Sequence, residues 1–270
     1  MMITPRPRRG TQARHLALAI VLFVVLVGAG VGTVVAWLRF QPVQRDARLC
    51  PVSGPLGHYV LVVDTTDPLN FVQRQAFDTW RHDLVERRLP KDYLLTVFAL
   101  GEDLQADARP LIELCNPGSG DDASNVTSNV RRLRRTYEDK FVKPLDGVSA
   151  SLVATIPART SPVIEMMQFA AINGFNKAHV AGEHRLIVLS DMLHNTPDFS
   201  MYQQGADLSY ERFAQTPYGR RANASLDHVE VELQYVMTDP RNQTRRQLKF
   251  WEDWFEHAGA RIVAVNRLEG

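Results

Sequence analysis

The segment VLVVDTTDPLN, residues 60–70, joins an apolar run to a cluster of oxygen-bearing side chains. Residues 60–63 are all apolar, which predicts a strand that is buried on both faces. Asp64, Thr66 and Asp67 follow at once, and Pro68 suits the first turn of a helix that Asp67 would cap. A buried strand leading directly into a helix is typical of the first unit of an α/β fold.

The same alternation of strand and helix continues to the end of the chain. Further strands are predicted at residues 93–100, 149–156, 184–191, 228–237 and 260–265, with a short extended piece within 107–115. Apolar residues at helical spacing predict helices at 68–89, 161–177 and 241–258, and a polar, arginine-rich helix is expected at 129–142. We therefore expect one α/β domain over residues 58–270, built on a doubly wound, mostly parallel sheet with helices on both faces.

A single transmembrane helix is predicted before this domain. The stretch Leu16–Leu38 carries no charge and is long enough to cross a bilayer core of about 30 Å. The preceding residues 1–14 then form a cytoplasmic stub, residues 15–38 the helix, and the proline-rich residues 39–57 a linker. A cleaved signal peptide is the alternative, although its apolar region is normally about 7–15 residues long. Gly28 and Gly32 have the GxxxG spacing through which two such helices can dimerise.

Charges and cysteines predict on which side of the membrane the domain lies. Four arginines precede the apolar stretch, whereas three arginines and one aspartate, Asp46, follow it closely. This difference in positive charge favours a cytoplasmic N-terminus. Cys50 and Cys115 are the only cysteines, and both follow the stretch, as expected for one disulfide in an oxidising compartment. Two unrelated buried thiols are the alternative. We expect a bacterial inner-membrane protein with a periplasmic domain, and the net charge of +1 gives no indication of a nucleic acid partner.

Three chain segments are expected to bring oxygen ligands to one edge of the sheet. In doubly wound folds, ligands bind beyond the carboxyl ends of the strands, where the strand order reverses. Asp64 and Asp191 each follow an apolar strand, Thr66 lies just beyond Asp64, and Ser161 begins a helix. Carboxylates and hydroxyls are the ligands that Mg²⁺ or Mn²⁺ prefers. The sequence therefore predicts a divalent cation site, to which Asp67 adds a carboxylate unless it only caps the helix.

The same residues resemble the metal-ion-dependent adhesion site of the von Willebrand factor A (vWA) domain, also called the integrin I domain. The first motif of that family is Asp-x-Ser-x-Ser after the first strand, and DTTDP places Asp64 and Thr66 in its first two positions. SPVIEM, residues 161–166, is similar to the family's threonine motif, with Ser161 at the threonine. VLSDM supplies Asp191 as the aspartate of the third motif.

The resemblance covers about residues 58–266, and two positions depart from the family pattern. Pro68 stands where the family has its second serine, and Met192 stands where it usually has glycine. The resemblance thus implies a variant adhesion site on a vWA fold. The chain is also similar to bacterial membrane-anchored proteins that carry DxTDPL, LCNPG and SDML segments in this arrangement.

These features favour a binding module over an enzyme. We expect a membrane-anchored module that uses a divalent cation to engage another envelope protein. The alternative is a structural subunit of an envelope or secretion complex, in which Asp64 and Asp191 are held by backbone N–H groups. A haloacid-dehalogenase-type phosphatase would need a second aspartate where Thr66 stands. A metal-dependent hydrolase would need a histidine base, but His184 and His194 are expected at the surface, so no catalytic residue is assigned.

Overall fold

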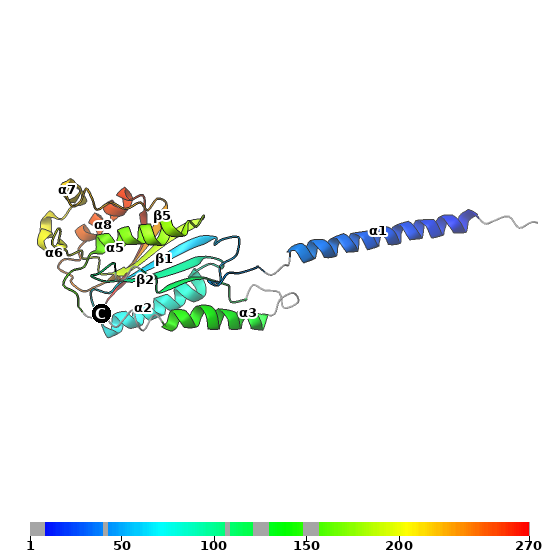
Figure 1. Ribbon diagram of the computed structural model, residues 1–270, viewed down its shortest axis with the longest axis horizontal. Helices are drawn as coiled ribbons and strands as arrows, with labels where there is room; N and C mark the ends of the chain where they lie inside the picture. The colour runs from blue at the N-terminus through cyan, green and yellow to red at the C-terminus, as the bar shows by residue number, and fades with distance from the viewer. Residues whose placement is uncertain (1–8, 40–42, 106–108, 121–129, 148–156, 270) are drawn as a thin grey trace, which may run out of the picture. The chain divides into compact units, whose positions relative to one another are not determined.

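The computed structural model describes residues 9–39, 43–105, 109–120, 130–147 and 157–269. The chain divides into two compact units, Met1–Val43 and Gln44–Gly270. The first contains α1 (Arg9–Arg39), which is drawn as one continuous helix in Figure 1. Its stretch His15–Val35 is long and apolar enough to cross a membrane and is exposed throughout, as the sequence predicts. A signal sequence would meet the same criteria of length and composition.

The second unit is built on one six-stranded sheet. The strand order is β3-β2-β1-β4-β5-β6, and only β3 is antiparallel to its neighbour. The strands are β1 (Gly57–Asp64), β2 (Leu94–Leu100), β3 (Ile112–Cys115), β4 (Glu183–Ser190), β5 (Val229–Val236) and β6 (Arg261–Leu268). This confirms the predicted mostly parallel α/β sheet, while the strand predicted at 149–156 falls outside the described residues. The order reverses between β1 and β4, which makes the carboxyl ends of these two strands the switch point.

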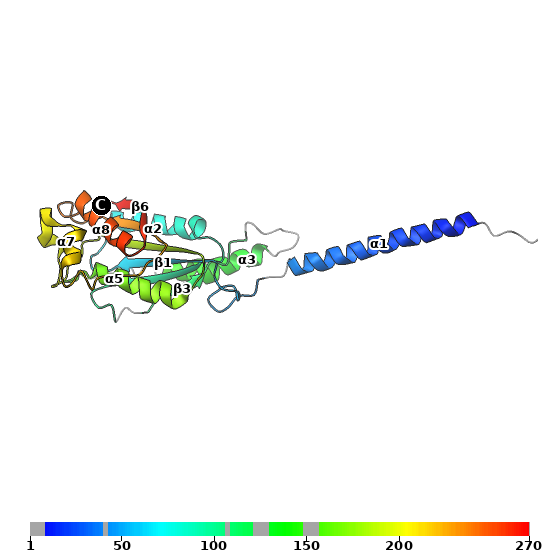
Figure 2. The same ribbon diagram turned by 90° about the horizontal axis from the view of Figure 1, so that it is seen from above.

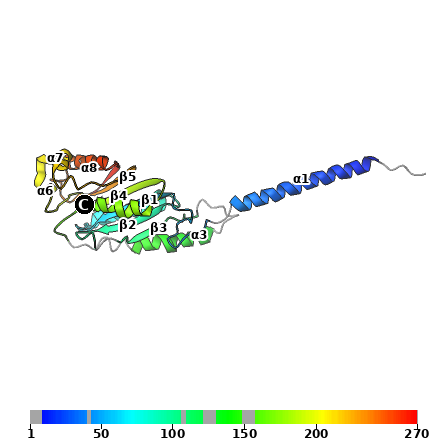
Figure 3. The ribbon, with the colours of Figure 1, turned by 45° about the horizontal axis from the view of Figure 1, so that its top comes forward.

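Helices cover both faces of the sheet (Figure 1). On one face lie α2 (Phe71–Asp83) with its continuation η1 (Leu84–Arg88), and α3 (Val130–Tyr137) with its continuation η2 (Glu138–Val142). On the other lie α5 (Val163–Phe169) with η3 (Ala170–Asn176), α6 (Met201–Gln204), η4 (Gly205–Asp207), α7 (Tyr210–Gln215) and α8 (Arg245–His257). Figures 2 and 3 show α6 and α7 at the same end of the unit as the C-terminus, which follows the carboxyl end of β6.

The central strands are buried on both faces because their side chains alternate between two apolar layers. Val60 and Val62 of β1 contact the layer under α5 and α8, whereas Leu61 and Val63 contact the layer under α2. Burial of each such side chain contributes about 1.5–3 kcal/mol to folding. The first layer includes Trp251, Trp254 and Phe255, and the second includes Phe77, Leu84 and Phe141.

The start of α2 differs from the prediction. Asn70, not Asp67, caps this helix: its side chain accepts from the backbone N–H of Gln73, and the Gln73 side chain accepts from the N–H of Asn70. This reciprocal capping box satisfies two donors that would otherwise lack partners. The helix therefore begins at Phe71, and Asp67 is free of the capping role that the sequence offered it.

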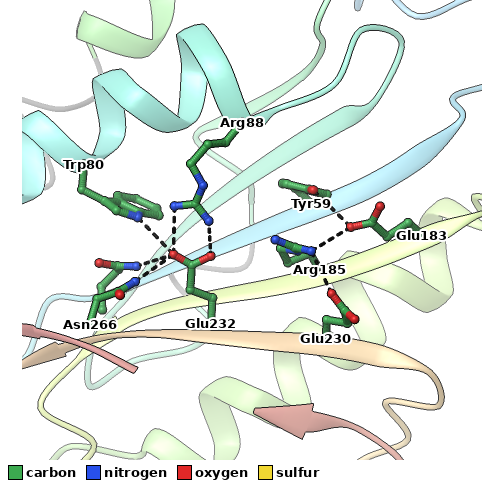
Figure 4. A network of polar contacts seen from close by, with 9 residues as sticks. Tyr59, Trp80, Arg88, Glu183, Arg185, Glu230, Glu232 and Asn266 are labelled. Atoms are coloured by element: carbon green, nitrogen blue, oxygen red, sulfur yellow. Dashed lines mark hydrogen bonds and ion pairs between the residues drawn. The ribbon is translucent and has the colours of Figure 1, made fainter. Parts of the chain in front are cut away.

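A buried ion pair joins η1 to strand β5 (Figure 4). Glu232 on β5 is only 1% exposed, and its carboxylate accepts two hydrogen bonds from Arg88 and one from the Trp80 indole. Burial alone would raise the pKa of Glu232, but the hydrogen bonds and charge of Arg88 outweigh it and lower that pKa. Glu232 is therefore ionised, and the side-chain amides of Gln234 and Asn266 also donate to its Oε1.

The segment before β1 is fastened to the amino edge of the sheet. Cys50 and Cys115 form a disulfide, as the sequence predicts. Arg45 pairs with Asp92 at 2.7 Å and donates to the carbonyl oxygen of Pro117. Residues 44–56, at the end of the predicted linker, thus form a strap that packs on the domain; we call them the strap below.

Removing the disulfide is expected to destabilise the domain. The bond closes a loop with a sequence separation of 65 residues, and the loss of that constraint on the unfolded chain corresponds to about 4 kcal/mol. Urea unfolding of the full-length Cys50→Ser/Cys115→Ser variant in detergent, followed by tryptophan fluorescence, measures this loss. Wild-type protein treated with reductant should unfold at the same lower urea concentration as the variant. Equal midpoints for the variant and the oxidised wild type would contradict the expectation.

Candidate cation site

Asp64 and Ser190 connect the carboxyl ends of β1 and β4. Asp64 is the last residue of β1 and Ser190 the last of β4, and the two strands are neighbours. The Ser190 hydroxyl donates to Asp64 Oδ2 at 2.7 Å. This bond lies at the switch point of the sheet, where a doubly wound fold leaves a crevice for ligands. Asp191, the next residue, is thereby placed beside Asp64.

Thr66 and Ser161 complete the group of side chains that the sequence predicted to meet here. The Thr66 backbone N–H donates to Asp64 Oδ1 at 2.9 Å, and its hydroxyl donates to the same oxygen at 2.7 Å. The Thr66 and Ser161 hydroxyl oxygens are 3.1 Å apart, and both side chains are buried. Ser161 also exchanges two backbone hydrogen bonds with Asn195, in the loop that follows β4. The structure therefore brings Asp64, Thr66 and Ser161 into direct contact.

Asp191 is buried at the same edge and held by two donors. Its Oδ1 accepts from the Leu193 backbone N–H at 2.8 Å, and its Oδ2 accepts from the Thr238 hydroxyl at 2.7 Å. Burial and, second to it, the negative charge of Asp64 together raise the pKa of Asp191 to about 7. Thr238 follows β5, and nothing in its sequence context distinguished it from an ordinary turn residue.

The pKa of Asp64 is also raised. Burial raises its pKa, hydrogen bonds from Thr66 and Ser190 offset part of that rise, and the charge of Asp67 adds to it. Within the described residues, no lysine or arginine side chain donates to either Asp64 or Asp191. Two neighbouring carboxylates are thus stabilised by dipoles alone, which leaves their combined negative charge without a counter-charge from these parts of the chain.

The turn after Asp191 adopts the backbone that a glycine would favour. Met192 has a φ of 58°, in the left-handed region that costs a residue with a side chain about 1–2 kcal/mol. Helix α8 holds this conformation: Gln247 and Trp251 both donate to the Met192 carbonyl oxygen, at 2.7 and 2.8 Å. Gln243 donates to the Asp191 carbonyl oxygen at 3.1 Å. Met192 therefore adopts a backbone conformation that a glycine would adopt at little cost.

Two further acidic residues and one tyrosine surround the pair. Asp67 is exposed, and its charge contributes to raising the pKa of both Asp64 and Asp191. The pKa of the half-buried Tyr202 is raised by burial and by the charges of four carboxylates, those of Asp191, Asp67, Asp239 and Asp64. The surroundings of Tyr202 are thus strongly negative, and no sequence pattern indicated that Asp239 would lie among these carboxylates.

His194 is buried, although it was expected at the surface. Its Nδ1 accepts from the Ile164 backbone N–H, and its Nε2 lies 3.2 Å from the Tyr218 hydroxyl, which donates to Glu165 at 2.6 Å. Burial lowers the pKa of His194 to about 3, so the ring is neutral. It fastens the loop after β4 to the start of α5, which keeps Ser161 and Asp191 on the same side of the crevice.

The donor chemistry fits a hard divalent cation. Among the described residues, no three His, Cys, Asp or Glu side chains converge as a soft or all-carboxylate site would require. The groups at this edge are two carboxylates and two hydroxyls. Asp64 Oδ1 already accepts two hydrogen bonds, whereas each of the other oxygens has a lone pair beyond the hydrogen bond it accepts. Mg²⁺ is held in proteins by one or two carboxylates and several waters, whereas Zn²⁺ prefers nitrogen and sulfur ligands. Thr66 and Ser161 would bind such an ion directly, with Asp64 and Asp191 supplying the charge.

Comparison with known proteins gives little further information. Neither a family model nor a curated protein matches the chain. Among solved structures, an aerotolerance-related membrane protein from Bacteroides fragilis NCTC 9343, crystallised with multiple mutations to serines, is similar over 79% of this chain and 91% of that chain. The sequence identity is 9% and the TM-score 0.32, and a similarity at that level carries no argument about this site.

The raised pKa of Asp191 predicts how stability depends on pH in the absence of metal. Its pKa is about 7 when folded and about 3.9 in an unfolded chain. The folded state therefore binds more protons between these values, and the free energy of unfolding falls as the pH rises from about 4 to about 7. Asp191→Asn should remove this part of the slope. Urea unfolding in EDTA across this pH range measures it.

The control for this experiment is Glu252→Gln, which removes an exposed carboxylate from α8. This variant should keep the pH slope of the wild type. If Asp191→Asn and wild type show the same slope, Asp191 ionises normally and the electrostatic account of the site is wrong.

Proposed function

We propose that this chain is a membrane-anchored binding module whose sheet edge engages a partner protein through a divalent cation. The observation that carries the proposal is the pair of carboxylates, Asp64 and Asp191, which lie at the switch point with two hydroxyls and no counter-charge among the described residues. Burial and the charges of neighbouring carboxylates raise both pKa values, and a cation there would offset these unfavourable effects. Mg²⁺ or Mn²⁺ suits the oxygen ligands.

The vWA resemblance supports this function and gives the site its mode of action. In that family the cation keeps an open coordination position that accepts a carboxylate from the partner. Here Pro68 removes one hydroxyl from the family's ligand set, and Asp67 is exposed beside it and free of any capping role. We propose that Asp67 compensates for the missing hydroxyl, either through a bridging water or as a ligand.

The surroundings of the site suit contact with a protein. Phe71 and Val72, at the start of α2, are 76% and 53% exposed, and they follow Asp67 within one short turn of chain. Tyr202, on α6, is 44% exposed and lies within the field of the rim carboxylates. Aromatic side chains are enriched in protein interfaces because they bury a large area at low entropic cost. We propose that these side chains surround the partner's carboxylate.

The second candidate is a structural subunit with an inactive metal site. The observation in its favour is that each oxygen of Asp64 and Asp191 already accepts a hydrogen bond from the protein. In that case the carboxylates would only fix the loops at the sheet edge. For either function we propose that α1 anchors the chain in the inner membrane with the domain in the periplasm, in keeping with the disulfide.

Retention of partner proteins on the immobilised full-length chain separates the two candidates. With Mg²⁺ present, wild type should retain a partner that is lost when EDTA replaces Mg²⁺. Ser161→Ala removes one predicted ligand and should lose the same partner even with Mg²⁺. The control is Ser225→Ala, which removes a hydroxyl that donates to Asp227 before β5. This variant should retain the partner with Mg²⁺ as wild type does. Retention of the same proteins in all conditions would support the structural subunit and contradict the cation-dependent function.

A further inference from the structure

Helix α3 presents an unusually basic surface. Its sequence VRRLRRTY contains four arginines and no acidic residue, and all four arginines are exposed. Leu133 lies between the two arginine pairs and is itself 39% exposed. Arg134 lies 4.0 Å from Glu138, and its side chain is 61% exposed. The helix therefore carries a dense positive charge that solvent reaches.

The position of this charge on the helix is unfavourable for folding. The N-terminal end of a helix carries a partial positive charge, so arginines in the first turn oppose the helix dipole. Arg131 and Arg132 occupy that first turn, which has no acidic residue. Packing does not require them there, because the helix is anchored further along by the buried side chains of Tyr137 and Phe141. The Tyr137 hydroxyl also donates to the Val85 carbonyl oxygen at 2.9 Å. An anion near this first turn is favourable, because it interacts well with both the arginines and the helix dipole.

The basic end of α3 lies at the amino edge of the sheet, where the strap is fastened. Leu133 lies against Gly120, at which an added Cβ would be 3.0 Å from that of Leu133. Gly120 continues the segment from Cys115, whose N–H donates to the strap at Arg48. The same segment receives a hydrogen bond from Arg45 through Pro117. The arginines, the 115–120 segment and the strap are therefore continuous at this edge.

The chain itself brings a lipid surface within reach of this edge. Residues 40–45 join the end of α1 to Arg45, which is fixed on the domain by Asp92. Six extended residues span about 20 Å at most. A bilayer that holds α1 is thus close enough to meet a surface at the amino edge, which is the reason to favour lipid over a soluble acidic protein.

We propose that Arg131, Arg132, Arg134 and Arg135 form a binding surface for the anionic headgroups of the membrane that holds α1. Guanidinium groups bind phosphate oxygens in a bidentate geometry. Each arginine near an anionic bilayer strengthens the association by roughly fivefold. This surface would limit the orientations that the domain can adopt on the membrane. It is independent of any cation at the carboxyl edge of the sheet.

A short-range probe on α3 tests this contact in the full-length protein. The described residues include no free cysteine, so Leu133→Cys gives a single labelling position for a fluorophore. The labelled protein is placed in lipid nanodiscs whose headgroups carry a nitroxide quencher. Quenching should be strong in discs with 40% phosphatidylglycerol and weak in phosphatidylcholine discs. It should fall in 0.5 M NaCl, because salt screens exposed charges within a few ångströms.

Two charge-matched variants complete the test. Replacing the four α3 arginines by glutamine should reduce quenching in anionic discs to the level of neutral discs. Replacing Arg220, Arg221, Arg245 and Arg246, which are also exposed, should leave it unchanged. A retained disulfide on non-reducing gels and unchanged tryptophan fluorescence show that each variant is folded. Equal quenching in both lipids, or a response to soluble polyglutamate alone, would overturn the proposal.

Discussion

The hydrogen bond from Ser190 to Asp64 is the contact on which the architecture of the site depends. It joins two parallel strands that are distant in sequence, at the point where the strand order reverses. The same contact sets Asp191 beside Asp64 and so creates a pair of carboxylates, of which Asp191 is buried and Asp64 half-buried. Burying one such charge is unfavourable and burying two is more so. The loops, the hydroxyls and α8 hold the two carboxylates in place, and a divalent cation would offset their unfavourable charge.

Much of this arrangement was predictable from the sequence, and the physical reason is the same in each case. Residues 60–63 and 186–189 are continuous apolar runs, which indicate buried parallel strands, and the aspartates that follow them must emerge at one edge. The disulfide was predictable because only two cysteines exist. The six-stranded order follows less directly, since the short antiparallel β3 and the edge strand β6 carry weak patterns of their own.

What the sequence did not reveal depends on tertiary contacts of polar residues. Thr238, Gln243 and Gln247 look like ordinary turn and helix residues, yet they hold the carboxylate and the carbonyl groups of the loop after β4. Met192 has a left-handed backbone, and Gln247 and Trp251 donate to its carbonyl oxygen. His194 was expected in solvent because it follows a strand, but the loop folds back and buries it under Tyr218. No local pattern encodes such long-range hydrogen bonds.

The central claim is that Asp64, Thr66, Ser161 and Asp191 hold one divalent cation, and crystals of the protein soaked in Mn²⁺ test it most directly. An anomalous difference map collected near the manganese edge should show a peak within about 2.5 Å of the Thr66 and Ser161 hydroxyl oxygens, with the carboxylates bound directly or through water. Ser161→Ala crystals should lose that peak. A wild-type map with no peak at this edge of the sheet, in crystals that bind Mn²⁺ elsewhere, would contradict the account.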